Sequence, residues 1–181
     1  MSDPIVVVSY SEEWPRECAK IGTALRQTLG GLAVRIDHSG STSVAGLAAK
    51  PVIDIQISVQ QLEPVDSYKL QLESAGFIHK AQNPDLTKRY FREAPGSRRT
   101  HIHVRESGSW PEQAALMFRD YLREHADDCA TYAEVKYRLA ELFRDDRHRY
   151  VEEKGTVVWE IMRRASEWSQ RTGWKPGASD Y

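Results

Sequence analysis

The stretch that decides the fold runs from His38 to Val59 and reads HSGSTSVAGLAAKPVIDIQISV. Its second part alternates strictly between an apolar row and a polar row, which are Ile53, Ile55, Ile57 and Val59 against Val52, Asp54, Gln56 and Ser58. A period of two residues predicts a half-buried strand with polar side chains on one face. The first part is rich in Gly, Ser and Thr, whose backbone N–H groups and small side chains suit an anion. The stretch therefore predicts a phosphate-binding loop that leads into a strand.

Helices and strands on either side of this stretch follow from the spacing of apolar residues. A helix capped by Ser11 ends at Gly30-Gly31, and the strand at 32–38 leads into the loop. The further predictions are a strand or extended arm at 5–8, a helix at 62–75, a strand at 76–79, and a hairpin of strands at 87–93 and 100–105. Strands and helices in this order predict a mixed α/β core.

From Ser109 onward the pattern is helical. Residues 109–112 read Ser-Trp-Pro-Glu, a capping box, and three apolar stripes follow at helical spacing. Residues 171–181 show no period and are expected to be a flexible tail. We predict one compact unit of the α/β (α+β) class, with a mixed sheet covered by helices on one face. Residues 1–105 form the core and residues 106–170 form C-terminal helices packed on it.

Composition narrows the classes of protein that fit. The 181 residues include 40% hydrophobic and 28% charged residues, which is typical of a globular protein with one core. No apolar run approaches the roughly 18 residues of a membrane span, and the N-terminus lacks signal-peptide features, so we expect a cytoplasmic protein. A net charge of −1 gives no reason to expect nucleic-acid binding. Cys18 and Cys129 are expected to be buried thiols, and the oligomeric state stays open.

The polar row of the central strand suggests a metal site. Asp54 and Gln56 are two residues apart, so their side chains project together, and oxygen ligands suit Mg²⁺. Gln56 is a neutral amide, so a third acidic group or the phosphates of the substrate would have to complete the site. Lys50 could place an ammonium group beside the loop as a charge for phosphate.

Two further features could belong to the same cleft. His101 and His103 share one strand face and fit a metal pair, a proton-transfer pair, phosphate contacts, or simply polar residues on a solvated face. The hairpin carries six basic residues against the single acid Glu93, namely Lys88, Arg89, Arg92, Arg98, Arg99 and Arg105. This excess predicts either an anionic partner or acidic neighbours in the fold.

The stretch resembles the signature of the GrpB family, which belongs to the nucleotidyltransferase superfamily. The superfamily pattern is a Gly-Ser loop followed by acidic-x-acidic on a strand, and it matches Gly40-Ser41 and Asp54. Other segments that resemble GrpB proteins are Trp14-Pro15, the His101 to Val104 segment, the Phe118 to Leu122 segment, Lys136 and the Tyr150 to Lys154 segment. The resemblance covers nearly the whole chain.

This resemblance implies a nucleoside triphosphate held by the loop, Mg²⁺ on carboxylates, and transfer of a nucleotidyl group to an acceptor. The residues expected to be catalytic are Asp54, His101 and His103, those expected to bind the metal are Asp54 and Gln56, and those expected to bind the phosphate-bearing small molecule are Gly40, Ser41, Thr42, Lys50, Arg89, Arg119, Lys136, Tyr150 and Lys154. A non-catalytic nucleotide- or anion-binding accessory module is one alternative, because GrpB-like domains are also fused to dephospho-CoA kinases, which suggests a link to coenzyme A metabolism. A transferase or ligase of another reaction type in the same cleft is the other alternative.

Overall fold

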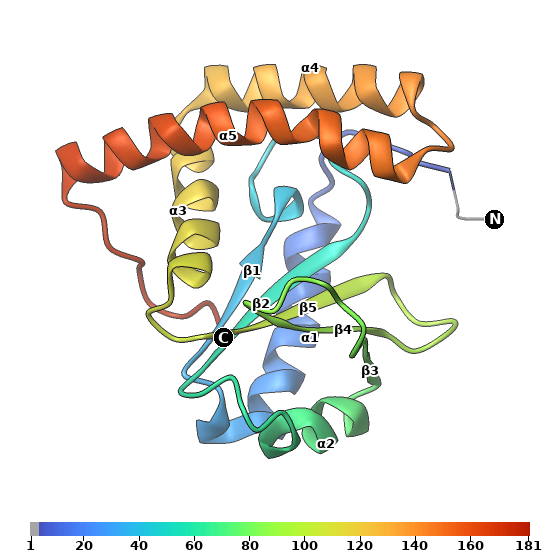
Figure 1. The fold of residues 1–181 in the computed structure, drawn as a ribbon, viewed down its shortest axis with the longest axis vertical. Helices are drawn as coiled ribbons and strands as arrows, with labels where there is room; N and C mark the ends of the chain where they lie inside the picture. Colours follow the sequence, from blue (N-terminus) through green and yellow to red (C-terminus); the bar gives the residue numbers. More distant parts are fainter. Residues whose placement is uncertain (1–3) are drawn as a thin grey trace.

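A five-stranded mixed sheet forms the centre of the computed structural model, which describes residues 4–181 (Figure 1). The strands are β1 (Arg35–Ser39), β2 (Ile53–Val59), β3 (Phe77–His79), β4 (Arg89–Glu93) and β5 (Thr100–Glu106). Their order is β1-β2-β5-β4-β3, and β2 runs parallel to β5 whereas the other neighbours are antiparallel. The parallel pair places the polar row of β2 next to the two histidines of β5.

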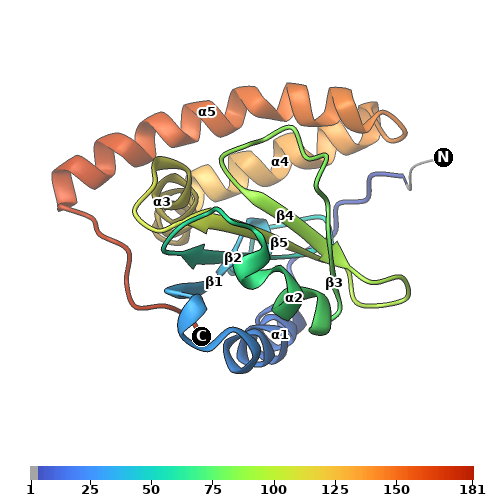
Figure 2. The same cartoon turned by 60° about the horizontal axis from the view of Figure 1, so that its bottom comes forward.

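One face of the sheet is covered by α1 (Glu13–Leu29) and α2 (Asp66–Ser74), as Figure 2 shows. The apolar row of β2 faces these helices, so strict alternation in the sequence corresponds to a buried row in the structure. Buried residues of this core include Cys18, Leu25, Ile36, Ile53, Ile55, Ile57, Leu72, Phe91 and Ile102. Cys129 is half-buried, and both cysteines are free thiols.

The three predicted C-terminal helices are α3 (Trp110–Glu124), α4 (Ala126–Leu142) and α5 (Arg147–Thr172). They lie on the side of the sheet opposite α1 and α2, so helices cover part of the second face as well, whereas the sequence predicted helices on one face (Figure 2). They share a second apolar core that includes Leu47, Met117, Tyr121, Tyr132 and Ile161. Helix α3 contacts β1 and β5, and its buried Glu112 accepts a hydrogen bond from Ser58 at 2.5 Å. Glu112 also accepts one from the Gly108 N–H at 2.8 Å, whereas the Ser109 side chain makes no capping bond. This part of the predicted capping box is therefore wrong, because Glu112 binds the sheet instead.

The last residues return to the sheet instead of forming the flexible tail expected from the sequence (Figures 1 and 2). Gly173 ends α5 in the left-handed region, at φ 65°. The Ser179 hydroxyl accepts a hydrogen bond from the Ile36 N–H at 2.8 Å, and the Tyr181 N–H donates to the Ile36 carbonyl at 3.1 Å. These contacts with the edge strand β1 join residues more than a hundred positions apart, so no local pattern reveals them. Within residues 4–181 no helix is long and apolar enough to cross a bilayer.

Candidate functional site

A cavity of about 250 Å³ lies where the Gly-Ser loop, the start of β2 and the C-terminal helices meet. Its lining residues are Gly40, Ser41, Thr42, Ala49, Lys50, Val52, Asp54, His101, Phe118, Tyr132, Lys136, Tyr150 and Lys154. Nine of these thirteen were predicted as site residues from the sequence. The four lining residues that were not predicted are Ala49, Val52, Phe118 and Tyr132. Their apolar or aromatic character equally predicts a core position, although Phe118 begins one of the segments that resemble GrpB proteins.

Asp54 forms the centre of a polar cluster on the floor of this cavity. The parallel register sets Asp54 opposite His101. Asp54 Oδ1 lies 3.3 Å from His101 Nδ1 and 3.1 Å from His103 Nε2, while the Tyr90 ring packs against both imidazoles. Burial alone would raise the pKa of Asp54, but hydrogen bonds from the two histidines and their charge hold it well below its usual range. Burial also lowers the pKa of His103. Asp54 is therefore a carboxylate that faces the cavity.

Gly40 lets the loop approach this carboxylate. It has φ +67°, a conformation that favours glycine, and a Cβ built there would lie only 2.6 Å from Asp54 Oδ2. Thr42 holds the following turn, because its hydroxyl donates to the Val52 carbonyl at 3.2 Å. The loop and the carboxylate thus form one continuous wall of the cavity.

Lysine side chains give the opposite wall its positive charge. Lys136 of α4 is only 3% exposed, and its Nζ donates to Ser41 Oγ at 3.0 Å and to the Ala48 carbonyl. Burial, together with the charge of Lys154, lowers the pKa of Lys136 to about 7, and burial lowers that of Lys50 to about 8. Among the described residues, no ion pair joins any of these three lysines to a carboxylate. A bound anion would supply the missing negative charge.

Tyr150 of α5 joins two of the lysines. The ring centroid of this buried tyrosine lies 5.4 Å from Lys50 Nζ and 5.6 Å from Lys154 Nζ. Burial raises the pKa of Tyr150, so its hydroxyl stays neutral and can donate a hydrogen bond. The aromatic ring thus positions two ammonium groups that come from different parts of the chain.

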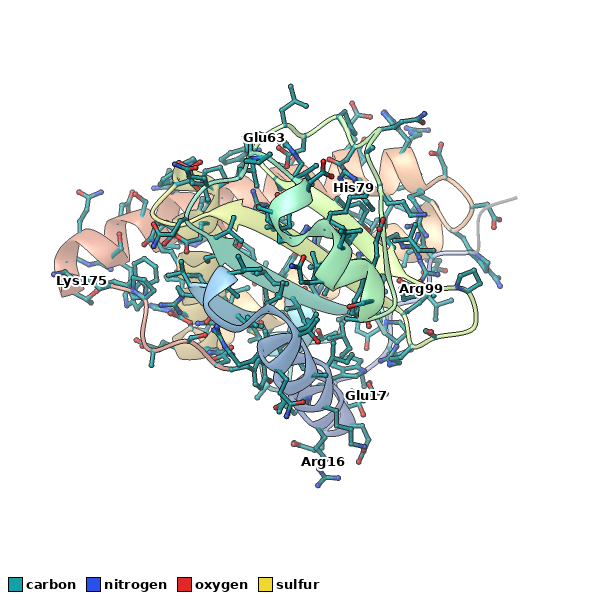
Figure 3. All side chains as sticks on the ribbon, turned by 90° about the horizontal axis from the view of Figure 1, so that it is seen from below. Arg16, Glu17, Glu63, His79, Arg99 and Lys175 are labelled. Atoms are coloured by element: carbon teal, nitrogen blue, oxygen red, sulfur yellow. The ribbon has the colours of Figure 1, made fainter. Side chains whose placement is uncertain are left out.

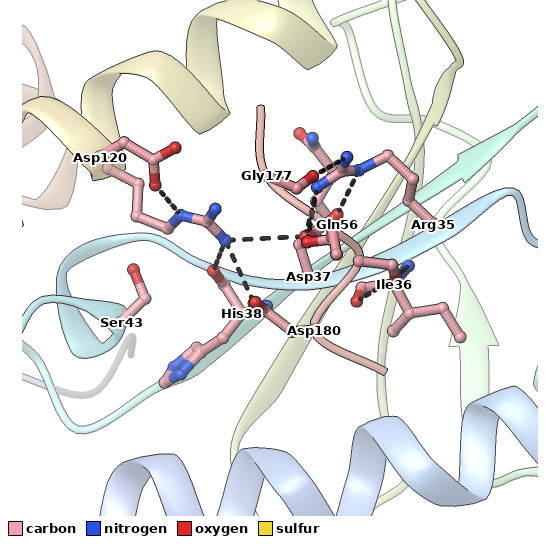
Figure 4. A network of polar contacts seen from close by, with 12 residues as sticks. Arg35, Ile36, Asp37, His38, Ser43, Gln56, Asp120, Gly177 and Asp180 are labelled. Carbon is pink, nitrogen blue, oxygen red and sulfur yellow. Dashed lines mark hydrogen bonds and ion pairs between the residues drawn. The ribbon is translucent and has the colours of Figure 1, made fainter. Parts of the chain in front are cut away.

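Gln56 lies outside the cavity, although it shares a strand face with Asp54. Its side chain is buried at 1% exposure, and its Nε2 donates to the Glu112 carbonyl at 3.2 Å. Figure 4 shows Gln56 next to Asp37 and Arg35, and Asp37 of β1 is its cross-strand neighbour. The structure therefore does not bring Gln56 into the cavity with Asp54, because a helix from later in the chain covers one half of the polar row.

Arg89 was predicted to reach the reacting group together with the histidines, and this prediction is wrong. It pairs with Val104 in the β4–β5 ladder, so it points to the opposite face from His103, whose cross-strand neighbour is Tyr90. The Arg89 Nε donates at 2.9 Å to Glu63, which Figure 3 shows from the α1 and α2 side. Arg98 similarly pairs with Glu17 at 2.8 Å. For these two arginines, acidic neighbours in the fold account for the basic hairpin.

Arg119 was predicted to bind phosphate, but its contacts are structural. The guanidinium is 4% exposed, and its Nη1 donates to the His38 carbonyl at 3.0 Å and to Asp180 at 3.1 Å. It also lies 3.7 Å from the fully buried Asp37, and its Nε donates to Asp120 at 2.8 Å (Figure 4). Arg119 therefore ties α3, β1 and the C-terminal segment together, and it does not line the cavity.

The sheet order and the Gly-Ser loop define a nucleotidyltransferase-like fold. The solved structure of Cid1, described for its RNA terminal uridylyl transferase activity, shares this fold with a TM-score of 0.52 at 17% identity, over 75% of this chain and 42% of Cid1. Residues 4–164 match the family described as GrpB protein, and the chain belongs to the GrpB family. The crystal structure of the conserved protein GrpB from Enterococcus faecalis matches with a TM-score of 0.82 at 31% identity, covering 90% of this chain and 99% of that chain.

The curated relatives differ in length. UPF0157 protein BH1888 from Halalkalibacterium halodurans is 33% identical over 162 residues, which cover 90% of this chain and 83% of that protein. A dephospho-CoA kinase from Mycolicibacterium paratuberculosis is 34% identical over 199 aligned positions, covering 96% of this chain and 49% of the kinase. UPF0157 protein YqkA from Bacillus subtilis is 32% identical and is matched over 48% of its length. The chain thus spans about half the length of some of its relatives.

Proposed function

We propose that the chain is a nucleotidyltransferase-like enzyme that binds a nucleoside triphosphate by its phosphates and transfers a nucleotidyl group to an acceptor. The observation that carries this proposal is the convergence of Lys50, Lys136 and Lys154 on a cavity that ends at the Asp54 carboxylate. Ammonium groups without carboxylate partners bind phosphate oxygens as point charges. The neutral Tyr150 hydroxyl and the Gly40-Ser41 loop add hydrogen-bond donors.

The size of the cavity fits the phosphate end of such a ligand. Its volume of about 250 Å³ lies just below the roughly 300–1,000 Å³ of typical small-molecule sites. The phosphates would be enclosed between the loop and the lysines, while the sugar and base extend toward solvent. Phe118 and Tyr132 offer apolar surface at the same wall.

The chemistry assigned to the chain's own residues is proton transfer. An acceptor hydroxyl oxygen forms a bond to the α-phosphorus, the bond from that phosphorus to the β-phosphate oxygen breaks, and pyrophosphate leaves. The proton of the hydroxyl passes to the Asp54 carboxylate, which faces the cavity. The lysines stabilise the charge that develops on the leaving pyrophosphate.

Titration with nucleoside triphosphates, with and without Mg²⁺, tests this proposal by thermal stability and by pyrophosphate release. We expect the wild type to be stabilised, Lys136→Met to lose this response, and Asp54→Asn to keep binding while losing pyrophosphate release. Among residues 4–181 the cavity offers Mg²⁺ one carboxylate, that of Asp54, so the effect of Mg²⁺ on nucleotide binding is measured separately. If no nucleoside triphosphate stabilises the wild type, the proposal is refuted.

The second candidate function is a non-catalytic anion-binding module, and the position of Gln56 favours it. Gln56 stands where the superfamily pattern has its second acidic residue, and its neutral amide binds the Glu112 carbonyl away from the cavity. The match to one half of a dephospho-CoA kinase suggests that such a module could serve an attached or separate enzyme of coenzyme A metabolism. Stabilisation by a nucleotide without pyrophosphate release, for any acceptor, would support this candidate.

A further inference from the structure

The donor atoms around Asp54 differ from those that suit Mg²⁺. Mg²⁺ demands near-octahedral oxygen ligands and is usually bound by carboxylates together with substrate phosphates. Here one carboxylate oxygen converges with two imidazole nitrogens, and Gln56 is bonded to Glu112. Imidazole nitrogen is a ligand for zinc, copper, iron and nickel, so the residues present do not fit the metal that the fold family implies.

The spacing of the three donor atoms is close to that of ligands around one divalent transition-metal ion. A divalent ion bound at about 2.0–2.2 Å by nitrogen and oxygen, in tetrahedral or octahedral geometry, holds its ligands about 3.0–3.5 Å apart. The distances from Asp54 Oδ1 to His101 Nδ1 and to His103 Nε2 are 3.3 and 3.1 Å, and all three atoms lie within 4.8 Å of one another. A closing movement of the two nitrogens, which lie within 4.8 Å of each other, brings all three atoms into contact with one ion.

The strand register and the packing of Tyr90 fix the positions of the three side chains, as neighbouring groups usually do for metal ligands. Asp54 and both histidines come from neighbouring strands in fixed register, and the Tyr90 ring lies 5.5 Å and 5.4 Å from the two imidazole centroids. Asp54 and His101 border the cavity. Two histidines and one carboxylate supply three ligands and leave coordination positions open.

We propose that Asp54, His101 and His103 bind one divalent first-row transition-metal ion, with its open positions toward the cavity that takes the phosphate. The ion would take the place of the Mg²⁺ that the resemblance to nucleotidyltransferases implies. The inference deepens the proposed function and rests on it for the role of the ion, since a phosphate oxygen would be the natural ligand at an open position. Binding of the ion itself needs no nucleotide.

Cobalt titration of the full-length chain, stripped of metal with a chelator, tests the site directly. We expect one equivalent of Co²⁺ per chain, seen by visible absorption and by metal analysis after dialysis, and displacement by Zn²⁺ but not by excess Mg²⁺. His103→Gln and Asp54→Asn should weaken binding about tenfold or more, whereas His148→Gln, an exposed histidine on α5, should not. Circular dichroism confirms that each variant is folded, and His101→Gln replaces any variant that is not.

The proposal is overturned if no transition ion binds, if Mg²⁺ competes at equal concentration, or if folded His103→Gln and His101→Gln both bind like the wild type. Because the titration contains no nucleotide, its outcome is separate from that of the nucleotide experiment. If the metal binds and no nucleotide stabilises the protein, the metal site is supported and the proposed function is refuted. If a nucleotide stabilises the protein and no transition-metal ion binds, the proposed function stands and the metal site is refuted.

Discussion

Replacement of Lys136 by methionine is expected to stabilise the free protein while abolishing anion binding. Lys136 is buried, no carboxylate within residues 4–181 forms an ion pair with it, and methionine has a similar length and no charge. Its pKa falls from the ordinary 10.5 to about 7, mainly through burial. At about 1.4 kcal/mol per unit of pKa, the burial of this charge costs the folded state roughly 4 kcal/mol at pH 7.

Two hydrogen bonds offset part of that cost. The bonds from Lys136 Nζ to Ser41 and to the Ala48 carbonyl contribute about 1 kcal/mol each, and methionine leaves their acceptors without this donor. Lys136→Met should therefore increase the free energy of unfolding by about 1–2 kcal/mol at pH 7. Lys136 would thus lower the stability of the ligand-free protein and contribute instead to the binding of an anion.

The pH dependence has a definite sign. Between pH 7 and pH 10.5, the unfolded chain binds more protons at Lys136 than the folded chain does, so wild-type stability rises with pH across this window. Lys136→Met lacks this contribution, and its advantage over the wild type should shrink toward zero by about pH 9.

Urea denaturation at both pH values, with and without a nucleoside triphosphate, measures these effects. Lys20→Met is the matched control, because Lys20 is exposed on α1 and its replacement should change stability by less than about 0.5 kcal/mol. The reasoning is refuted if Lys136→Met lowers the free energy of unfolding at pH 7 by more than about 1 kcal/mol and still responds to nucleotide, since Lys136 would then be a structural residue.

Three further predictions concern the loop, the buried arginine and the pH dependence of binding. Gly40→Ala should lose nucleotide binding in a titration because its Cβ would meet Asp54, whereas Gly96→Ala, which shares a positive φ but has open space around it, should cost only about 1 kcal/mol in urea denaturation. Arg119→Met should lower the free energy of unfolding by about 3 kcal/mol, because a buried charge network loses its cation, and unchanged stability would contradict this role. Nucleotide affinity measured by calorimetry should fall as pH rises from about 7 to about 9, as Lys136 loses its proton. A flat profile would exclude Lys136 as a phosphate ligand.

Much of the sheet could be predicted because its evidence is local. The alternation from Ile53 to Val59 reports which residues of β2 share a face, whatever surrounds the strand, and the Pro-Gly turn predicts the hairpin of β4 and β5. The same alternation places His101 and His103 on one face. Arg89 was assigned to the wrong face because the strand register, with Tyr90 opposite His103, comes from pairing and not from the residue pattern.

The sequence by itself determined the loop, the apolar row that becomes the core, and the residue types available to the site. Only the tertiary structure decided which of them meet: the parallel register sets Asp54 beside His101, and α3 buries Gln56 while Asp54 stays at the cavity. The same holds for Lys136, which reaches the loop from a helix about ninety residues later. The physical reason is that periodicity is set by each segment's own backbone geometry, whereas these meetings depend on packing between segments far apart in the chain.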